Sequence, residues 1–219
     1  MASQRWAQSV ARRLLKGVPV HHGYAHSSRV AGFARQIAIG ERFNREETRQ
    51  LLIAAWLHDV GRSKDTKRHA LISAEIVHDL LNKEGEGKEA KQNIVSAIYS
   101  HSRLERASTE LGCALKDADM LDGFGQIVLE REITSKHPGT VFDQLWESIK
   151  SYKLPDEMRK GVKELLESLR TPLGWYGLLT TRTARSIGIT PYAELKGYEV
   201  ILKDLLAGKP PPKAIVVTE

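Results

Sequence analysis

Residues 51–62 read LLIAAWLHDVGR, an apolar helical run that ends in a His-Asp doublet. His58 lies seven residues after Leu51 and three after Ala55, so it continues the apolar stripe of one helix. Asp59 follows it directly, where the helix is expected to end. Two polar side chains at the end of such an apolar run indicate a buried polar site. Because the helix is expected to unwind here, the two adjacent side chains could reach the same ion.

The rest of the chain also has helical periodicity. Asn44 is a good N-cap, and Glu47 three residues later completes a capping box for the helix that contains the doublet. We find no internal repeat and no alternation typical of strands. The pattern predicts helices over residues 2–16, 22–41, 45–58, 69–82, 88–101, 114–136, 140–152, 156–170, 173–187 and 191–207.

We therefore expect an all-α protein with one compact domain over residues 1–207. Its motif-bearing core is expected over about 22–136, and helices over about 140–207 form a C-terminal helical extension. Three prolines in GKPPPKAIVVTE forbid a helix there, which predicts a flexible tail over 208–219.

The composition is that of an ordinary globular protein. Of the 219 residues, 41% are hydrophobic and 27% are charged, which permits one good core and excludes wholesale disorder. Cys113 is the single cysteine, which excludes a disulfide framework and a cysteine-based zinc site. No apolar run is long enough for a membrane span. We expect a cytoplasmic protein, with an Arg-rich organelle targeting peptide as the alternative for the N-terminus.

Positive charge is concentrated in the first third of the chain. Residues 1–70 hold 13 Lys and Arg against 5 Asp and Glu, whereas residues 71–219 hold 20 against 22. A basic region favours an anionic partner: a phosphorylated small molecule, nucleic acid or a membrane surface. Composition does not choose among these three.

Six ionisable side chains fall on inward helix faces or at helix ends. They are His26, His58, Asp59, His69, His101 and Asp119. Burying them without partners would be costly, whereas one divalent cation would satisfy imidazole and carboxylate groups together. A single inward histidine is more often a hydrogen-bonded core residue, so the hypothesis depends on the set. The remaining histidines, His21, His22, His78 and His137, receive no role, and His78 is expected to be solvated.

Three motifs in order carry a family resemblance. HSSRVAGFARQIA begins at His26, LLIAAWLHDVGR holds the doublet, and LKDADMLDGFG surrounds Asp119. Together they resemble the HD superfamily of metal-dependent phosphohydrolases, over about residues 22–136. A bare HD dipeptide is a weak signal, but three segments in this order are specific.

The resemblance implies that one divalent metal ion is bound by His26, His58, Asp59 and Asp119. Some branches of the family hold a second metal with two further histidines, and the aspartate of the doublet bridges the two ions. His69 and His101 occupy those places, although in a single-metal site they would contact phosphate or the attacking water. Mixed imidazole and carboxylate ligands lead us to expect Mn or Fe, with Ni, Co, Zn or Mg as alternatives.

The implied mechanism is attack of a metal-activated water on phosphorus, with Asp59 as a catalytic residue. The basic loop GRSKDTKR follows the doublet and supplies cations for the phosphate. Arg62 is expected to be catalytic and to bind substrate, and Arg29, Lys64 and Arg68 are expected to bind substrate. A solvated surface is the alternative interpretation of the loop cations, and the proton donor stays unassigned.

The expected substrate is a nucleotide or a related small phosphorylated molecule. We see no synthetase-like domain beside the site, which argues against an alarmone enzyme. The Gly-Tyr-Pro signature of the cyclic dinucleotide phosphodiesterases is absent after His101, which argues against that branch. One alternative is a non-catalytic nucleotide-binding HD module. The other is a nucleic-acid-binding protein that uses the basic N-terminal segment, although no recognised nucleic-acid motif is present. We expect no membrane partner and no specific nucleic acid, and the oligomeric state is not predicted.

Overall fold

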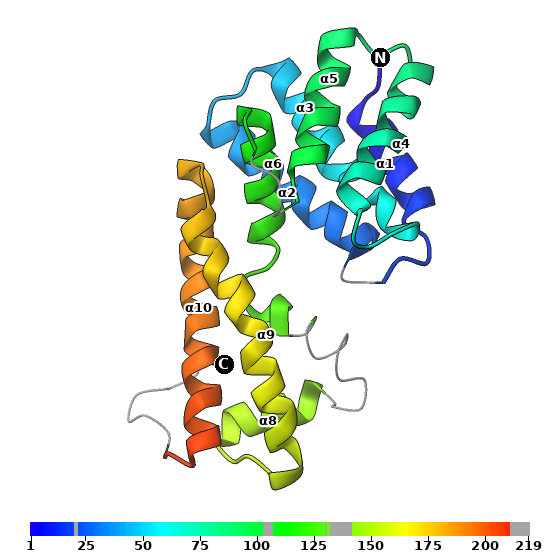
Figure 1. Ribbon diagram of the computed structural model, residues 1–219. Helices are drawn as coiled ribbons and strands as arrows, with labels where there is room; N and C mark the ends of the chain where they lie inside the picture. The colour runs from blue at the N-terminus through cyan, green and yellow to red at the C-terminus, as the bar shows by residue number, and fades with distance from the viewer. Residues whose placement is uncertain (20–21, 103–106, 130, 132–141, 211–219) are drawn as a thin grey trace. The chain divides into compact units, whose positions relative to one another are not determined.

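The computed structural model describes residues 1–19, 22–102, 107–129, 131 and 142–210, and Figure 1 shows it as a ribbon. These residues form helices joined by turns, with no strand among them, so the all-α prediction is confirmed. They group into two compact units. The first comprises Met1–Asp122 with Leu178–Gly188, and the second comprises Gly123–Gly177 with Ile189–Glu219. Whether these units form one domain, as the sequence predicts, stays a prediction.

The first unit is built around one central helix. Its helical elements are α1 (Gln4–Leu14), α2 (Tyr24–Gly40), α3 (Arg45–Leu57), η2 (Val60–Ser63), α4 (His69–Lys83), α5 (Lys88–Ser100) and α6 (Glu110–Leu121). Every residue of α3 from Gln50 to Leu57 is buried, because α1, α2, α5 and α6 all pack against this helix. The predicted capping box is confirmed: the Asn44 side chain accepts hydrogen bonds at the helix start, and the Asn44 N–H donates to the Glu47 carboxylate.

The second unit holds α8 (Phe142–Ser151), η3 (Asp156–Met158), α9 (Arg159–Trp175) and most of α10 (Arg182–Ala207). Several predicted boundaries are wrong. Breaks were expected near Pro172 and Pro191, but both prolines lie inside helices. The chain instead breaks between η4 (Tyr176–Leu178) and α10.

This break is set by a contact that is distant in the sequence. Asp117, fully buried on α6, accepts hydrogen bonds from the backbone N–H groups of Thr180 and Thr181 at 3.0 and 2.7 Å. The Thr180 hydroxyl donates to the same carboxylate at 3.1 Å. A residue whose N–H is committed to another helix cannot continue its own, so the helix begins again only at Arg182.

The helix predicted over 114–136 is interrupted, because α6 ends at Leu121, Asp122 caps it, and helical residues resume only at 126. Residues 130 and 132–136 of that prediction lie outside the described residues, as do most of the predicted tail, His21 and His137. None of the helices in the described part of the chain is long and apolar enough to cross a membrane.

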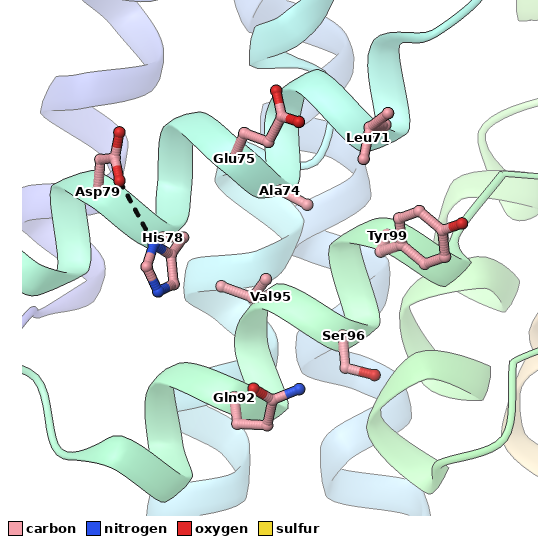
Figure 2. Close-up of a pocket in the computed structure, with 9 residues that line it drawn as sticks. All are labelled: Leu71, Ala74, Glu75, His78, Asp79, Gln92, Val95, Ser96 and Tyr99. Atoms are coloured by element: carbon pink, nitrogen blue, oxygen red, sulfur yellow. Dashed lines mark hydrogen bonds and ion pairs between the residues drawn. The ribbon is translucent and has the colours of Figure 1, made fainter.

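A groove of about 630 Å³ lies between α4 and α5. Figure 2 shows its lining, which includes His78 and Asp79 on α4 and Tyr99 on α5. His78 is exposed there, as predicted. The groove contains none of the six predicted metal ligands.

Candidate metal centre

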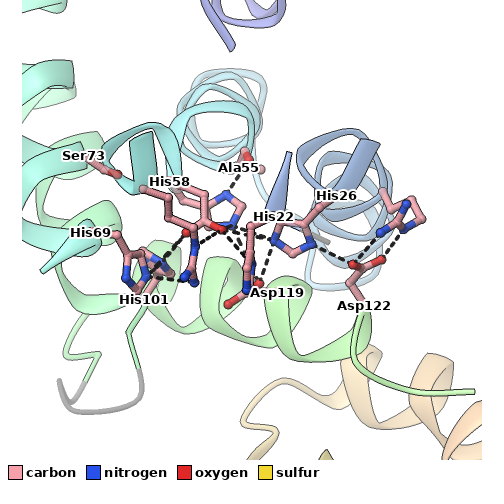
Figure 3. Close-up of polar contacts among 12 residues, drawn as sticks. His22, His26, Ala55, His58, His69, Ser73, His101, Asp119 and Asp122 are labelled. Atoms are coloured by element: carbon pink, nitrogen blue, oxygen red, sulfur yellow. Dashed lines mark hydrogen bonds and ion pairs between the residues drawn. The ribbon is translucent and has the colours of Figure 1, made fainter. Parts of the chain in front are cut away.

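Six side chains from five segments meet in the interior of the first unit. Figure 3 shows the labelled residues of this cluster with their polar contacts. The chain positions them at helix ends and on inward faces: His26 on α2, His58 and Asp59 after α3, His69 at the start of α4, His101 after α5 and Asp119 on α6. His26, His58, Asp59 and His101 are buried, whereas His69 and Asp119 are partly exposed. The predicted convergence of these residues is present.

Four of the six form a first ligand group. The Nε2 atom of His26 lies 3.2 Å from Nε2 of His58 and 3.2 Å from Oδ1 of Asp119. Asp59 Oδ2 lies 3.7 Å from His26 Nε2 and 3.8 Å from His58 Nε2. Ligand atoms about 2.1 Å from one metal ion are roughly 3 to 3.5 Å apart. This spacing is therefore close to what one divalent ion requires.

The other oxygen of Asp59 faces a second ligand group. Oδ1 lies 3.4 Å from Nε2 of His69 and 3.7 Å from Nε2 of His101, and the two nitrogens are 3.3 Å apart. Oδ1 is buried and has no hydrogen-bond partner in the described part of the chain. Burying a carboxylate oxygen without a hydrogen bond costs free energy, so we expect this atom to bind a cation.

The tautomers of the histidines fit that requirement. Three of them donate a hydrogen bond from Nδ1 to a backbone carbonyl three residues earlier: His58 to Ala55 at 2.8 Å, His69 to Thr66 at 2.8 Å and His101 to Ile98 at 2.5 Å. A carbonyl only accepts, so Nδ1 carries the proton and Nε2 keeps its lone pair. Metal-binding histidines are held in the same way. Lone pairs and carboxylates that face one another are stabilised by a positive ion between them.

His26 is oriented by a carboxylate instead. Its Nδ1 lies 2.7 Å from Oδ2 of Asp122, which is buried at the end of α6. Arg29, one turn along α2, donates to both oxygens of Asp122 at 2.5 and 3.0 Å. Burial opposes ionisation, but these hydrogen bonds outweigh it and lower the pKa of Asp122. Arg29 was predicted to bind substrate; its observed partner is Asp122, so the substrate role stays a prediction.

The pKa values of His26, Asp59 and Asp119 show that the cluster stabilises a positive charge. Burial works against charge, yet Asp119 and Asp122 together raise the pKa of His26 to about 9. The pKa of Asp59 and that of Asp119 are both held well below the usual value by neighbouring histidines, against the effect of burial. In the absence of a cation, a proton on His26 therefore supplies the charge among these carboxylates.

The predicted substrate cations differ in their surroundings. Arg62 is bonded within the cluster, with Nε 2.6 Å from Asp59 Oδ2 and Nη2 3.3 Å from His69 Nε2. Lys64 and Arg68 are exposed on the loop that follows. Their predicted roles toward a substrate stay predictions.

One residue of the cluster was missed from the sequence. His22 Nδ1 lies 3.3 Å from Asp59 Oδ2, and its side chain is 27% exposed. Burial lowers the pKa of His22 to about 4, so the imidazole is neutral at physiological pH. With His26 and Asp59 it forms a third set of atoms that could share an ion. Its spacing of four residues before His26 was a usable signal, but His22 stands at the very end of the helix predicted over 22–41 and therefore received no role; the structure begins α2 only at Tyr24.

A close approach of backbones holds the two ligand groups together. The N–H of Gly61, two residues after Asp59, donates to Ser73 Oγ on α4 at 2.8 Å. A Cβ atom at Gly61 would lie 2.5 Å from the His69 carbonyl oxygen and 2.7 Å from the Ser73 nitrogen. Glycine therefore lets η2 pack directly on the first turns of α4, which places His69 beside the doublet.

The three motif segments now coincide with one described site, and the HD domain family model matches residues 23–123. The chain contains an HD domain. HD domains bind divalent metals, and this one presents the His and Asp groups described above. The match agrees with the resemblance seen in the sequence. None of the curated proteins compared with the chain matches it.

Solved structures share the fold along almost the whole chain. A predicted HD superfamily hydrolase from an uncultured Thermotogales bacterium is 23% identical with a TM-score of 0.61, and the match covers 93% of this chain and 91% of that one. YpgQ of Bacillus subtilis in complex with ADP is 22% identical with a TM-score of 0.65, covering 92% and 93%. A Lactobacillus plantarum protein is 20% identical with a TM-score of 0.67, covering 94% and 97%. The HD domain and the helices after it thus belong to one recurring fold.

Proposed function

We propose that this protein is a metal-dependent phosphohydrolase that acts on a phosphate ester or phosphoanhydride of a nucleotide or related small molecule. The observation that carries the proposal is the pair of oxygens of Asp59. Each faces a separate set of imidazole Nε2 atoms, and one of them lacks any hydrogen bond in the described structure. A bound divalent ion would supply a water nucleophile near neutral pH and would neutralise charge on the phosphate.

The residues take distinct roles in this proposal. His26, His58, Asp59 and Asp119 hold one ion, and Asp59 Oδ1 with His69 and His101 offers a place for a second. The expected element is Mn or Fe, since the set mixes imidazole and carboxylate ligands and contains no thiolate. Arg62 would stabilise the transferring phosphoryl group.

Two observations support the substrate class: positive charge on the loop after the doublet, and the ADP bound in one similar structure. Lys64 and Arg68 add positive charge beside the cluster, and the structure of YpgQ holds ADP. Both favour a nucleotide or a similar polyphosphate. A cytoplasmic location is part of the same proposal, since the single cysteine and a nucleotide substrate fit that compartment.

The test combines metal content with turnover. We expect the purified protein to bind Mn²⁺ in calorimetry and to release phosphate or pyrophosphate from a panel of nucleoside mono-, di- and triphosphates. His58→Ala and Asp59→Ala should each lose metal and reduce turnover by at least 100-fold, as roughly expected for loss of an ion that activates water. His78→Ala, an exposed histidine outside the cluster, should retain both.

Three outcomes decide against the proposal or redirect it. Full metal content and turnover in both doublet variants would exclude it. Nucleotide binding without turnover under Mn²⁺, Fe²⁺, Co²⁺, Ni²⁺, Zn²⁺ or Mg²⁺ would favour a binding module. Binding of DNA or RNA that weakens steeply with salt, without nucleotide turnover, would favour the nucleic-acid function.

A further inference from the structure

Arg62 is itself a cation that lies between the two ligand groups. Its Nε donates to Asp59 Oδ2 at 2.6 Å, and its Nη2 donates to His69 Nε2 at 3.3 Å. The side chain is only 14% exposed, so the guanidinium is largely withdrawn from water. Arg62 therefore hydrogen-bonds one ligand atom of each of the two proposed metal positions.

These bonds compete with metal binding, most clearly at His69. The Nδ1 proton of His69 is committed to the Thr66 carbonyl, so Nε2 has a single lone pair to offer. That lone pair cannot accept a hydrogen bond from Arg62 and bind a metal ion at the same time. At Asp59 Oδ2, a metal ion would also be repelled by a guanidinium held 2.6 Å from the same oxygen.

Once released, the guanidinium is suited to bind a substrate phosphate. The arginine fork matches a phosphate with two parallel hydrogen bonds. Arg62 belongs to η2, directly after Asp59, so its side chain stays close to the cluster when it leaves the carboxylate. A phosphate that bridges the metal and the guanidinium would remove the repulsion between the two cations.

We propose that Arg62 is a resident cation, which a divalent ion displaces from His69 and Asp59, and which then binds the substrate phosphate. The proposal rests on the proposed function and adds an order of events: the metal binds first and thereby makes Arg62 available to substrate. It also means that Arg62 weakens metal binding in the absence of substrate.

The test measures Mn²⁺ affinity by calorimetry without any phosphate present. We expect Arg62→Gln to bind Mn²⁺ about tenfold more tightly than the wild type, which equals about 1.4 kcal/mol. Removal of any nearby positive charge would favour a cation somewhat. Lys67→Gln removes the same charge from an exposed position on the same loop, and its dissociation constant should change by less than about twofold.

A second measurement follows the released arginine, with inorganic phosphate as the probe. With Mn²⁺ bound, Arg62→Gln should bind phosphate at least about tenfold more weakly than the wild type, whereas Lys67→Gln should bind it nearly as the wild type does. Circular dichroism of the Mn²⁺-loaded proteins checks that both variants are folded.

Equal or weaker Mn²⁺ binding by folded Arg62→Gln, relative to Lys67→Gln, would overturn this inference and leave the proposed function intact. Unchanged phosphate binding in the Mn²⁺-loaded Arg62→Gln protein would also overturn it. Failure of the wild type to bind any of Mn²⁺, Fe²⁺, Co²⁺, Ni²⁺, Zn²⁺ and Mg²⁺ would overturn the proposed function and this inference together.

Discussion

At the scale of single residues, the site is prepared by hydrogen bonds on the outer side of each imidazole. His58, His69 and His101 are fixed by backbone carbonyls, which any sequence provides. His26 depends on the side chain of Asp122. This makes Asp122 the outer partner whose identity can be changed without altering the main chain.

Asp122→Asn should therefore lower Mn²⁺ affinity by about 10- to 100-fold, the usual effect of losing a carboxylate behind a metal-binding histidine. The measurement is calorimetry on the purified variant. Arg29→Gln should weaken Mn²⁺ binding in the wild type but add little in the Asp122→Asn background, because Arg29 acts through that carboxylate.

Asp117→Asn is the matched control, since Asp117 is also a buried carboxylate on α6 but bonds to Thr180 and Thr181 instead. It should lower thermal stability and leave the Mn²⁺ dissociation constant of the folded protein unchanged. Equal losses of affinity in the two variants would show that Asp122 supports only the fold.

At the scale of elements, the placement of α4 on η2 decides whether the two ligand groups can share Asp59. The contact depends on Gly61, whose missing side chain lets the backbone of η2 approach His69 and Ser73. A larger residue must push these elements apart and move His69 away from Asp59.

Gly61→Ala should therefore lower the free energy of unfolding by about 1 to 3 kcal/mol, as overpacking does, and weaken Mn²⁺ binding as well. Urea unfolding and calorimetry measure the two effects. Gly32→Ala, on α2 with no atom within 4 Å of the added Cβ, should be neutral or more stable by up to about 1 kcal/mol. Unchanged Mn²⁺ affinity in a destabilised Gly61→Ala protein would show that the contact between η2 and α4 is not needed for metal binding.

The elements also show which features could be predicted from the sequence. The start of α3 and the position of the doublet depend on local signals, namely Asn44, Glu47 and the apolar period, and both were predicted. The break before α10 depends on Asp117, more than 60 residues away in the chain, so no local pattern contains it. The sequence predicts breaks at 171–172 and 188–190, whereas Pro172 and Pro191 lie inside continuous helices. Whether a helix tolerates a proline is decided by tertiary packing, which a local pattern does not contain.

The candidate site was predicted more completely than the element boundaries. Its members occur at helix ends and inward faces, which the helical period reveals. The hydrogen-bond partners of those residues could not be predicted as well from the sequence. The contact of Arg29 with Asp122 joins positions that only the folded chain brings together. The same is true of the contact between His22 and Asp59.

At the scale of the whole molecule, the cluster links stability to pH and to metal. The pKa of His26 is about 9 in the folded metal-free protein, against 6.5 for the unfolded group. A raised pKa contributes stability that is fully present below pH 6.5 and is lost as the pH rises through 9. The neutral histidines His22 and His69, whose pKa is lowered by burial, affect stability below pH 6.5 instead.

The chelated protein should therefore lose up to about 3 kcal/mol of unfolding free energy as the pH rises from 6.5 to 9. Urea titrations with excess chelator across this range measure the loss. Saturating Mn²⁺ should remove it, because the ion takes the place of the proton. His26→Gln should show a flat profile, and His78→Gln should keep the slope; a flat profile in the wild type would contradict the prediction.

The hydrogen bonds between Asp117 and the segment that begins at Leu178 bear on where the polypeptide can be cut. The family match ends at residue 123, yet Leu178–Gly188 belongs to the same compact unit as the metal centre. A fragment trimmed to the matched stretch would leave the Asp117 carboxylate buried with no donor, on the very helix that carries Asp119. Excision at the end of the family match would thus damage the interior of this unit, and shortened versions should retain the chain at least through Gly188.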